Sequence, residues 1–177
     1  NSLKERADEL YNQSNYDAAI TKYNQLIDID KKNGDIYLMR GLSKGNSGDL
    51  RGAVEDINDA ILIQPKGDYY YHLGRMKQYM GDTASAIDSY TLTIKNDSTI
   101  FEAYNNRGLL YERLDRHEDA LKDLNKSIML YPNFSIGYNN RGMFYQRKEQ
   151  HNKAIMDFDK AINLDSNISF LFYNRAT

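Results

Sequence analysis

Three arginines are each followed, sixteen residues later, by an aspartate: Arg40–Asp56, Arg107–Asp123 and Arg141–Asp157. A guanidinium and a carboxylate can form two parallel hydrogen bonds, so the spacing predicts ion pairs between neighbouring helices. The alternative is a row of arginines that binds an anionic ligand. Leu73 and Ser89 occupy the same two positions in another segment, so both charges disappear together. We therefore expect structural pairs, in which losing one partly buried partner costs more than an exposed pair contributes.

Asparagine also recurs, at Asn106, Asn140 and Asn174, each 34 residues apart. A side-chain amide offers a donor and an acceptor together, which matches a peptide bond. Spaced asparagines can therefore hold an extended peptide backbone without reading its side chains. The series is incomplete, because the earlier equivalents are Glu5, Met39 and His72. The alternative, that these asparagines belong to a repeated helical turn with no ligand, stays open.

Catalytic and metal-binding patterns are absent from the sequence. The histidines His72, His117 and His151 form no His-x-x-x-His pair, and there is no glycine-rich phosphate loop. The chain has no cysteine, which excludes disulfides, thiolate metal sites and cysteine nucleophiles. We expect a protein that is not an enzyme and that uses no metal and no cofactor.

The composition and charge of the chain argue against two kinds of partner, nucleic acid and the membrane interior. The formal net charge of −2 argues against nucleic acid, whose binding proteins carry a basic stripe. No apolar run approaches the roughly 18 residues that span a bilayer, so no membrane insertion is expected. No signal peptide is visible, and both ends look cut, as in a fragment of a longer protein. The compartment is left open between cytoplasm and, if a signal was removed, periplasm.

These residues must be positioned by a repeat. An alanine before a branched residue recurs at spacings of 33 or 34, at Ala19, Ala53, Ala86, Ala120 and Ala154. The apolar positions around Ala154 fall on one face of a helix, and Gly48-Asp49 and Gly81-Asp82 mark turns with helix-capping aspartates. The repeats are 1–33, 34–66, 67–100, 101–134, 135–168 and a partial one at 169–177. The second is one residue short near Lys66, where we expect a local change in the angle between repeats.

The period and its residues resemble the tetratricopeptide repeat family. The fourth repeat carries Tyr104, Gly108, Tyr111, Ala120 and Pro132, and the fifth carries Tyr138, Gly142, Tyr145, Ala154 and Phe158. The resemblance implies an all-α, right-handed superhelical solenoid of antiparallel helix hairpins, as a single domain over 1–177. Glycine and alanine at fixed positions would let the two helices of a hairpin approach closely.

The resemblance also implies a concave face where the family binds extended peptides or partner proteins. Residues expected on that face are Leu38, Leu42, Tyr71, Arg75, Tyr79, Asn106, Leu109, Arg113, Asn140, Met143, Arg147 and Asn174. Aromatic residues and arginine are enriched at binding hot spots. Arg113 and Arg147 favour acidic ligand residues at the C-terminal end, and some tyrosines could instead pack between repeats.

The expected function is therefore a non-catalytic scaffold that binds a peptide or a partner protein. The family's clamp for a C-terminal carboxylate is argued against, because only Lys4 fits that pattern and Asp8, Met39, Asp68 and His72 do not. Two alternatives are kept. One is self-association through Phe170, Leu171 and Phe172, whose covering helix is missing, and the other is a regulatory arm of a larger enzyme.

Overall fold

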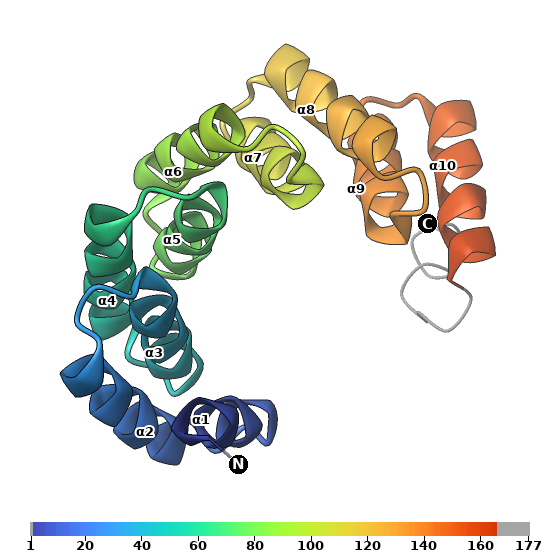
Figure 1. Ribbon diagram of the computed structural model, residues 1–177. Coiled ribbons are helices and arrows are strands. Elements are labelled where there is room, and N and C mark those ends of the chain that lie inside the picture. Colours follow the sequence, from blue (N-terminus) through green and yellow to red (C-terminus); the bar gives the residue numbers. More distant parts are fainter. Residues whose placement is uncertain (1, 166–177) are drawn as a thin grey trace. The chain divides into compact units, whose positions relative to one another are not determined.

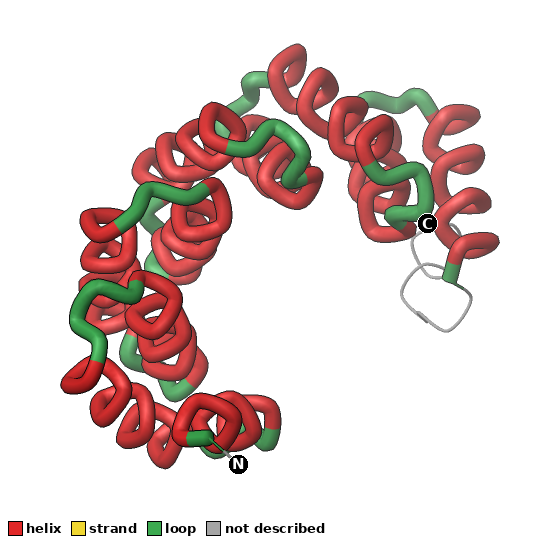
Figure 2. The backbone as a smooth tube through the Cα atoms, in the orientation of Figure 1, coloured by secondary structure: helices red, strands yellow, loops and turns green. Residues whose placement is uncertain are grey.

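The described chain consists of α-helices joined by short turns and loops. The computed structural model describes residues 2–165, which form ten α-helices and no strand (Figure 2). They follow one another as α1 Leu3–Asn12, α2 Tyr16–Ile29, α3 Gly34–Asn46, α4 Leu50–Ile63, α5 Gly67–Tyr79, α6 Thr83–Asn96, α7 Phe101–Arg113, α8 His117–Leu130, α9 Ser135–Arg147 and α10 His151–Leu164. Consecutive helices pack as hairpins, which confirms the predicted all-α fold. Asn174 and the Phe170–Phe172 segment lie outside the described residues.

The helices fall into two compact units, divided after Asp97. The first unit holds α1–α6 and the second holds α7–α10. Within each unit the odd-numbered helices lie along one side and the even-numbered helices along the other (Figure 1). We call the side of the odd-numbered helices the A-helix face. The expectation of one domain over 1–177 stays a prediction.

Each hairpin turns through a residue in the left-handed backbone region. Glycine fills this position at Gly48 and Gly81, with φ of 100° and 78°. The next residues, Asp49 and Asp82, accept hydrogen bonds from the first turns of α4 and α6, which confirms them as helix caps. The other three hairpins place a non-glycine residue at the turn, namely Ser14, Asp115 and Glu149, with φ between 57° and 59°.

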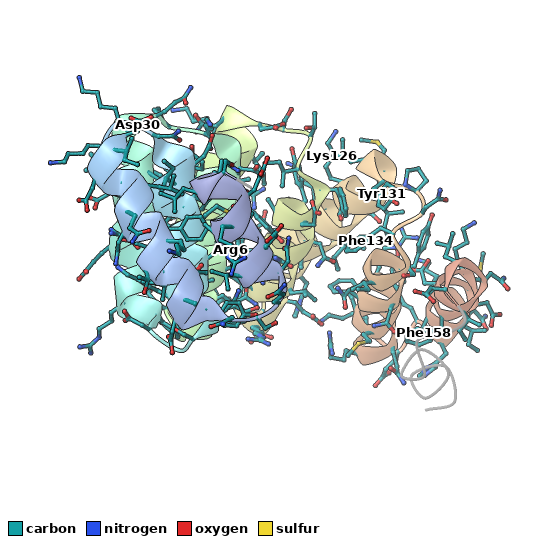
Figure 3. The ribbon with its side chains drawn as sticks, turned by 60° about the horizontal axis from the view of Figure 1, so that its bottom comes forward. Arg6, Asp30, Lys126, Tyr131, Phe134 and Phe158 are labelled. Carbon is teal, nitrogen blue, oxygen red and sulfur yellow. The ribbon has the colours of Figure 1, made fainter. Side chains whose placement is uncertain are left out.

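Small residues let the two helices of a hairpin approach closely, as predicted. A Cβ atom added at Gly41 would lie 3.1 Å from the carbonyl oxygen of Ala53. At Gly142 it would lie 2.6 Å from the Phe158 ring, which projects from α10 (Figure 3). A larger side chain at either glycine would push the helices apart.

The loops that join successive hairpins differ in length. The loop before α5 is one residue shorter than the loop before α3, because α4 ends at Ile63 and α5 begins at Gly67. The missing residue therefore lies where the sequence places it, while the change in angle stays a prediction. In the second unit, the centroid of the Phe101 ring lies 4.8 Å from that of Tyr131 and 4.8 Å from that of Phe134. Tyr131 and Phe134 belong to the α8–α9 loop and are labelled in Figure 3.

The core of the first unit includes two residues expected on the binding face. Leu38 and Leu42 are only 9% exposed, in one cluster with Tyr69 and Met76 of α5. The expectation that they face solvent is wrong, because large side chains on the next odd-numbered helix cover them. Leu38 keeps only an edge that reaches a small cleft.

Candidate functional site

The structure brings together all three predicted arginine–aspartate pairs. Arg40 donates from Nε and Nη2 to the two oxygens of Asp56 at 2.8 and 2.7 Å. The other two pairs have the same paired geometry, at 2.7 and 3.0 Å for Arg107–Asp123 and at 2.7 Å twice for Arg141–Asp157. The aspartates are buried, and the hydrogen bonds that Arg40 donates to Asp56 raise the pKa of Arg40.

Two of these arginines also reach back to the preceding hairpin. Arg40 Nη1 donates to Asn24 Oδ1, and Arg141 Nη1 donates to Asn125 Oδ1, both at 2.7 Å. Each guanidinium therefore joins its own hairpin to the one before. The sequence analysis missed these asparagines, although each lies sixteen residues before its arginine, a spacing visible in the sequence.

A cleft of about 770 Å³ opens on the A-helix face of the second unit. Its walls come from α7, α9 and the turn between α7 and α8. The lining residues are Leu109, Glu112, Arg113, Asp115, His117, Asn140, Met143, Arg147 and Lys148. Five of the residues predicted for peptide binding therefore share one cleft.

Arg147 forms an ion pair with another residue that lines this cleft. Arg147 donates from Nε and Nη2 to the two oxygens of Glu112, both at 2.5 Å. Its charge is therefore balanced by a carboxylate of α7, and the expectation of an acidic ligand residue beside Arg147 stays a prediction. Arg113 is exposed and makes no ion pair within residues 2–165. The positive end of the cleft thus belongs to Arg113 and the half-buried Lys148.

Amide side chains connect the two helices across the cleft. Asn140 Nδ2 donates to Asn105 Oδ1 at 2.9 Å, and Asn105 Nδ2 donates to Asn106 Oδ1 at 3.1 Å. Asn105 is only 4% exposed and was not predicted as part of the site. Its neighbouring position, directly before Asn106, was the available signal. No described residue donates to Asn140 Oδ1, so this acceptor remains for a ligand.

His117 is a further residue that the sequence analysis did not place at the site. It is the first residue of α8, and its Nε2 lies 3.7 Å from Asp115 Oδ1. Its Nδ1 is buried and has no hydrogen-bond partner among the described residues. The ring packs edge-on against Phe144, with centroids 6.4 Å apart.

In the first unit, three predicted binding residues lie on α5. Arg75 Nη2 donates to the Tyr79 hydroxyl at 3.1 Å, and Tyr79 is 61% exposed. Tyr71 packs edge-on against His72 at 5.3 Å and lies 6.1 Å from the Tyr90 ring. Both contacts lie within the repeat 67–100, so a role for Tyr71 in ligand binding stays a prediction.

Within residues 2–165, no group of three or more histidines or carboxylates could hold a metal ion. Within that range, no helix combines the length and apolar character that a membrane crossing needs.

Family models match three segments of the chain. Those described as tetratricopeptide repeats match residues 101–134 and 137–168, and one described as a TPR repeat matches residues 7–48. Among curated relatives, zebrafish (Danio rerio) tetratricopeptide repeat protein 36 is 28% identical over 102 residues, covering 55% of this chain and 54% of that protein. Human tetratricopeptide repeat protein 13 is 25% identical over 120 residues, covering 64% of this chain and 14% of that protein. The chain thus spans about half of the first relative and a small part of the second.

Solved structures share the fold. MamA superimposes with a TM-score of 0.79 at 24% identity, covering 92% of this chain and 96% of its own. YrrB, described as a TPR protein with an unusual peptide-binding site, has a TM-score of 0.75 at 19% identity, with coverages of 97% and 89%. Cut9, in its complex with Hcn1, has a TM-score of 0.83 at 18% identity, with coverages of 96% and 34%. These similarities show an all-α helical repeat solenoid.

Proposed function

The chain belongs to the tetratricopeptide repeat family, and from this premise we propose that it is a scaffold that binds an extended peptide of a partner protein in the cleft of its second unit. Proteins of this family bind protein partners and are typically non-catalytic, and we propose the same for this chain. The observation that carries the proposal is the gathering of Leu109, Arg113, Asn140 and Met143 around one cleft on the A-helix face.

The chemistry of the cleft suits a peptide. Leu109 and Met143 offer apolar surface for a ligand side chain, and methionine adapts its shape to different partners. Asn140 Oδ1 can accept a hydrogen bond from a ligand backbone N–H. Arg113 offers an exposed guanidinium to a ligand carboxylate, where a charge-assisted hydrogen bond contributes about 1.5–3 kcal/mol. One apolar, one amide and one cationic contact recognise an extended chain better than they recognise a small apolar molecule.

The comparison with YrrB supports this class of ligand. YrrB shares the fold and is described as having a peptide-binding site. The identity is too low to transfer individual residues, so the proposal rests on the side chains of this chain. Self-association through Phe170–Phe172 and a regulatory role in a larger enzyme remain alternatives without a supporting observation in the described residues.

A peptide-display selection tests the proposal. The protein would be screened as wild type, as the double variant Leu109→Ser/Met143→Ser, and as the control Met156→Ser. Met156 is 71% exposed on α10 and lies outside the cleft. Met156→Ser therefore replaces an apolar side chain with a polar one, as the double variant does, without changing the cleft. We expect wild type and control to enrich one peptide family that the double variant loses. Equal enrichment by all three proteins, or no enrichment by any, would reject peptide binding at this cleft.

A further inference from the structure

A second, smaller cleft of about 350 Å³ lies in the first unit, among α1, α2 and α3. Its floor is apolar and consists of Leu26, Ile36, Leu38 and Met39. Two carboxylates stand at its rim, Asp8 on α1 and Asp35 on α3. An apolar floor below two negative charges has a clear complement, which is an aliphatic stem that ends in a cation.

Both carboxylates are held in place by buried tyrosines. The Tyr23 hydroxyl donates to Asp8 Oδ1 at 2.7 Å, and the Tyr69 hydroxyl donates to Asp35 Oδ1 at 2.5 Å. Each tyrosine is only 1% exposed, so its hydroxyl is fixed by the core. The rim is therefore preorganised, and little ordering is required when a ligand binds.

The remaining oxygen atoms determine what the rim can accept. Asp35 Oδ1 accepts hydrogen bonds from the Tyr69 hydroxyl and from Lys66 Nζ, the latter at 2.8 Å. No described residue donates to Asp35 Oδ2. Lys4 Nζ lies 2.6 Å from Asp8 Oδ2. The Lys4 side chain is 65% exposed, and such pairs along a helix contribute only about 0.3–0.5 kcal/mol. A ligand cation can therefore displace Lys4 at small cost.

The hydrogen bonds from Lys66 and Tyr69 lower the pKa of Asp35, so it carries its charge at neutral pH. Asp35 is thus a permanent acceptor at the edge of the apolar floor. Lys4 already pairs with Asp8 and Lys66 already pairs with Asp35, so a ligand cation has to replace Lys4 on Asp8 and take the open oxygen Oδ2 of Asp35.

We propose that this cleft binds a basic side chain, lysine or arginine, of a partner polypeptide. The aliphatic stem lies along Ile36 and Met39, and the cationic head reaches Asp35 Oδ2 and replaces Lys4 on Asp8. This site is separate from the cleft between α7 and α9 and does not depend on its function. The chain thus presents two clefts of opposite preference, one for an acidic and one for a basic side chain.

Titration with defined peptides tests the proposal. The probe is a blocked pentapeptide with lysine between two leucines, compared with the same peptide carrying norleucine or glutamate. Binding is followed by ¹H–¹⁵N NMR, which reports where the peptide contacts the protein. We expect the lysine peptide to shift resonances of Met39 and its neighbours and to bind about tenfold more tightly than the norleucine peptide, as one charge-assisted hydrogen bond predicts.

Asp35→Asn is expected to weaken the binding of the lysine peptide, and Lys4→Met is expected to strengthen it. Asp35→Asn should abolish the preference for lysine, whereas Asp68→Asn, the equivalent exposed position on α5, should leave it intact. Because Asp35→Asn also alters a contact with Tyr69, Lys4→Met provides a test that leaves the core unchanged. Removing the competing ammonium should tighten the lysine peptide several-fold. Equal affinity for the lysine and norleucine peptides, or no gain from Lys4→Met, would overturn the proposal whatever happens at Leu109 and Met143.

Discussion

Arg147 on α9 forms two parallel hydrogen bonds with Glu112 on α7, both 2.5 Å long. The pair joins two successive hairpins, and both residues line the larger cleft. Arg147 therefore serves the geometry of the site, and the recognition of a negatively charged ligand falls to Arg113. This division leads to the first prediction.

Arg113→Gln should weaken an acidic peptide selected by the wild type by about tenfold, because one charge-assisted hydrogen bond is lost. A version of that peptide with its acidic residue replaced by glutamine should bind both proteins alike. The dissociation constants of the two peptides, measured by isothermal titration calorimetry, check this. An equal loss for both peptides would mean that Arg113 supports the fold and does not read charge.

The buried ion pairs predict a stability difference. Asp157→Asn should lower the free energy of unfolding by about 2–4 kcal/mol, because Arg141 loses its charged partner in a largely buried place. Asp119→Asn removes the exposed pair with Arg116 and should cost less than about 1 kcal/mol. Asn125→Ala should fall between them, at about 1 kcal/mol, since it removes one hydrogen bond. Urea unfolding of the three variants measures the order, and similar losses for Asp157→Asn and Asp119→Asn would contradict it.

The hairpin turns predict a stabilising change. Glu149 has a φ of 57°, where a side chain costs about 1–2 kcal/mol and glycine costs nothing. Glu149→Gly should therefore raise the free energy of unfolding by about 0.5–1 kcal/mol after the entropy of glycine is counted. Glu149→Ala, which retains the strain, is the control and should show no such gain. The converse change, Gly81→Ala, should destabilise the protein. Thermal unfolding resolves these shifts.

His72 predicts how stability changes with pH. Burial lowers its pKa to about 4 in the folded chain, against an ordinary value of about 6.5 when unfolded. The unfolded chain therefore takes up a proton first as pH falls. Stability from this residue is fully present above pH 6.5 and is lost progressively down to about pH 4, by at most about 3 kcal/mol. His72→Gln should lose less stability over that range, as measured by denaturation at several pH values. Parallel losses in both proteins would contradict this assignment.

Much of the fold could be predicted from spacing alone. Alanine and glycine recur about every 34 residues, at positions where the two helices of a hairpin are in contact and only a small side chain fits. These residues therefore mark each repeat in the sequence. The aspartates after Gly48 and Gly81 predicted helix starts for the same local reason. The Arg40–Asp56 pair was predictable because the third repeat replaces both the arginine and the aspartate, with Leu73 and Ser89.

Contacts between repeats were harder to predict. Leu38 and Leu42 occupy positions that face solvent only when the next odd-numbered helix carries small residues, and Tyr69 and Met76 are large. Glu112 and Arg147 are 35 residues apart, on different helices, so no local rule pairs them. Asn105 was missed because a buried amide is indistinguishable in sequence from an exposed one.

The most direct test of the scaffold's binding cleft is NMR mapping of a display-selected peptide on protein with labelled leucine and methionine methyl groups. The proposed function predicts that the peptide shifts the methyl resonances of Leu109 and Met143 while Met156 on α10 stays unchanged. Shifts confined to Met156 and other methyl groups outside the cleft, with Leu109 and Met143 unmoved, would contradict the assignment of this cleft as the peptide site.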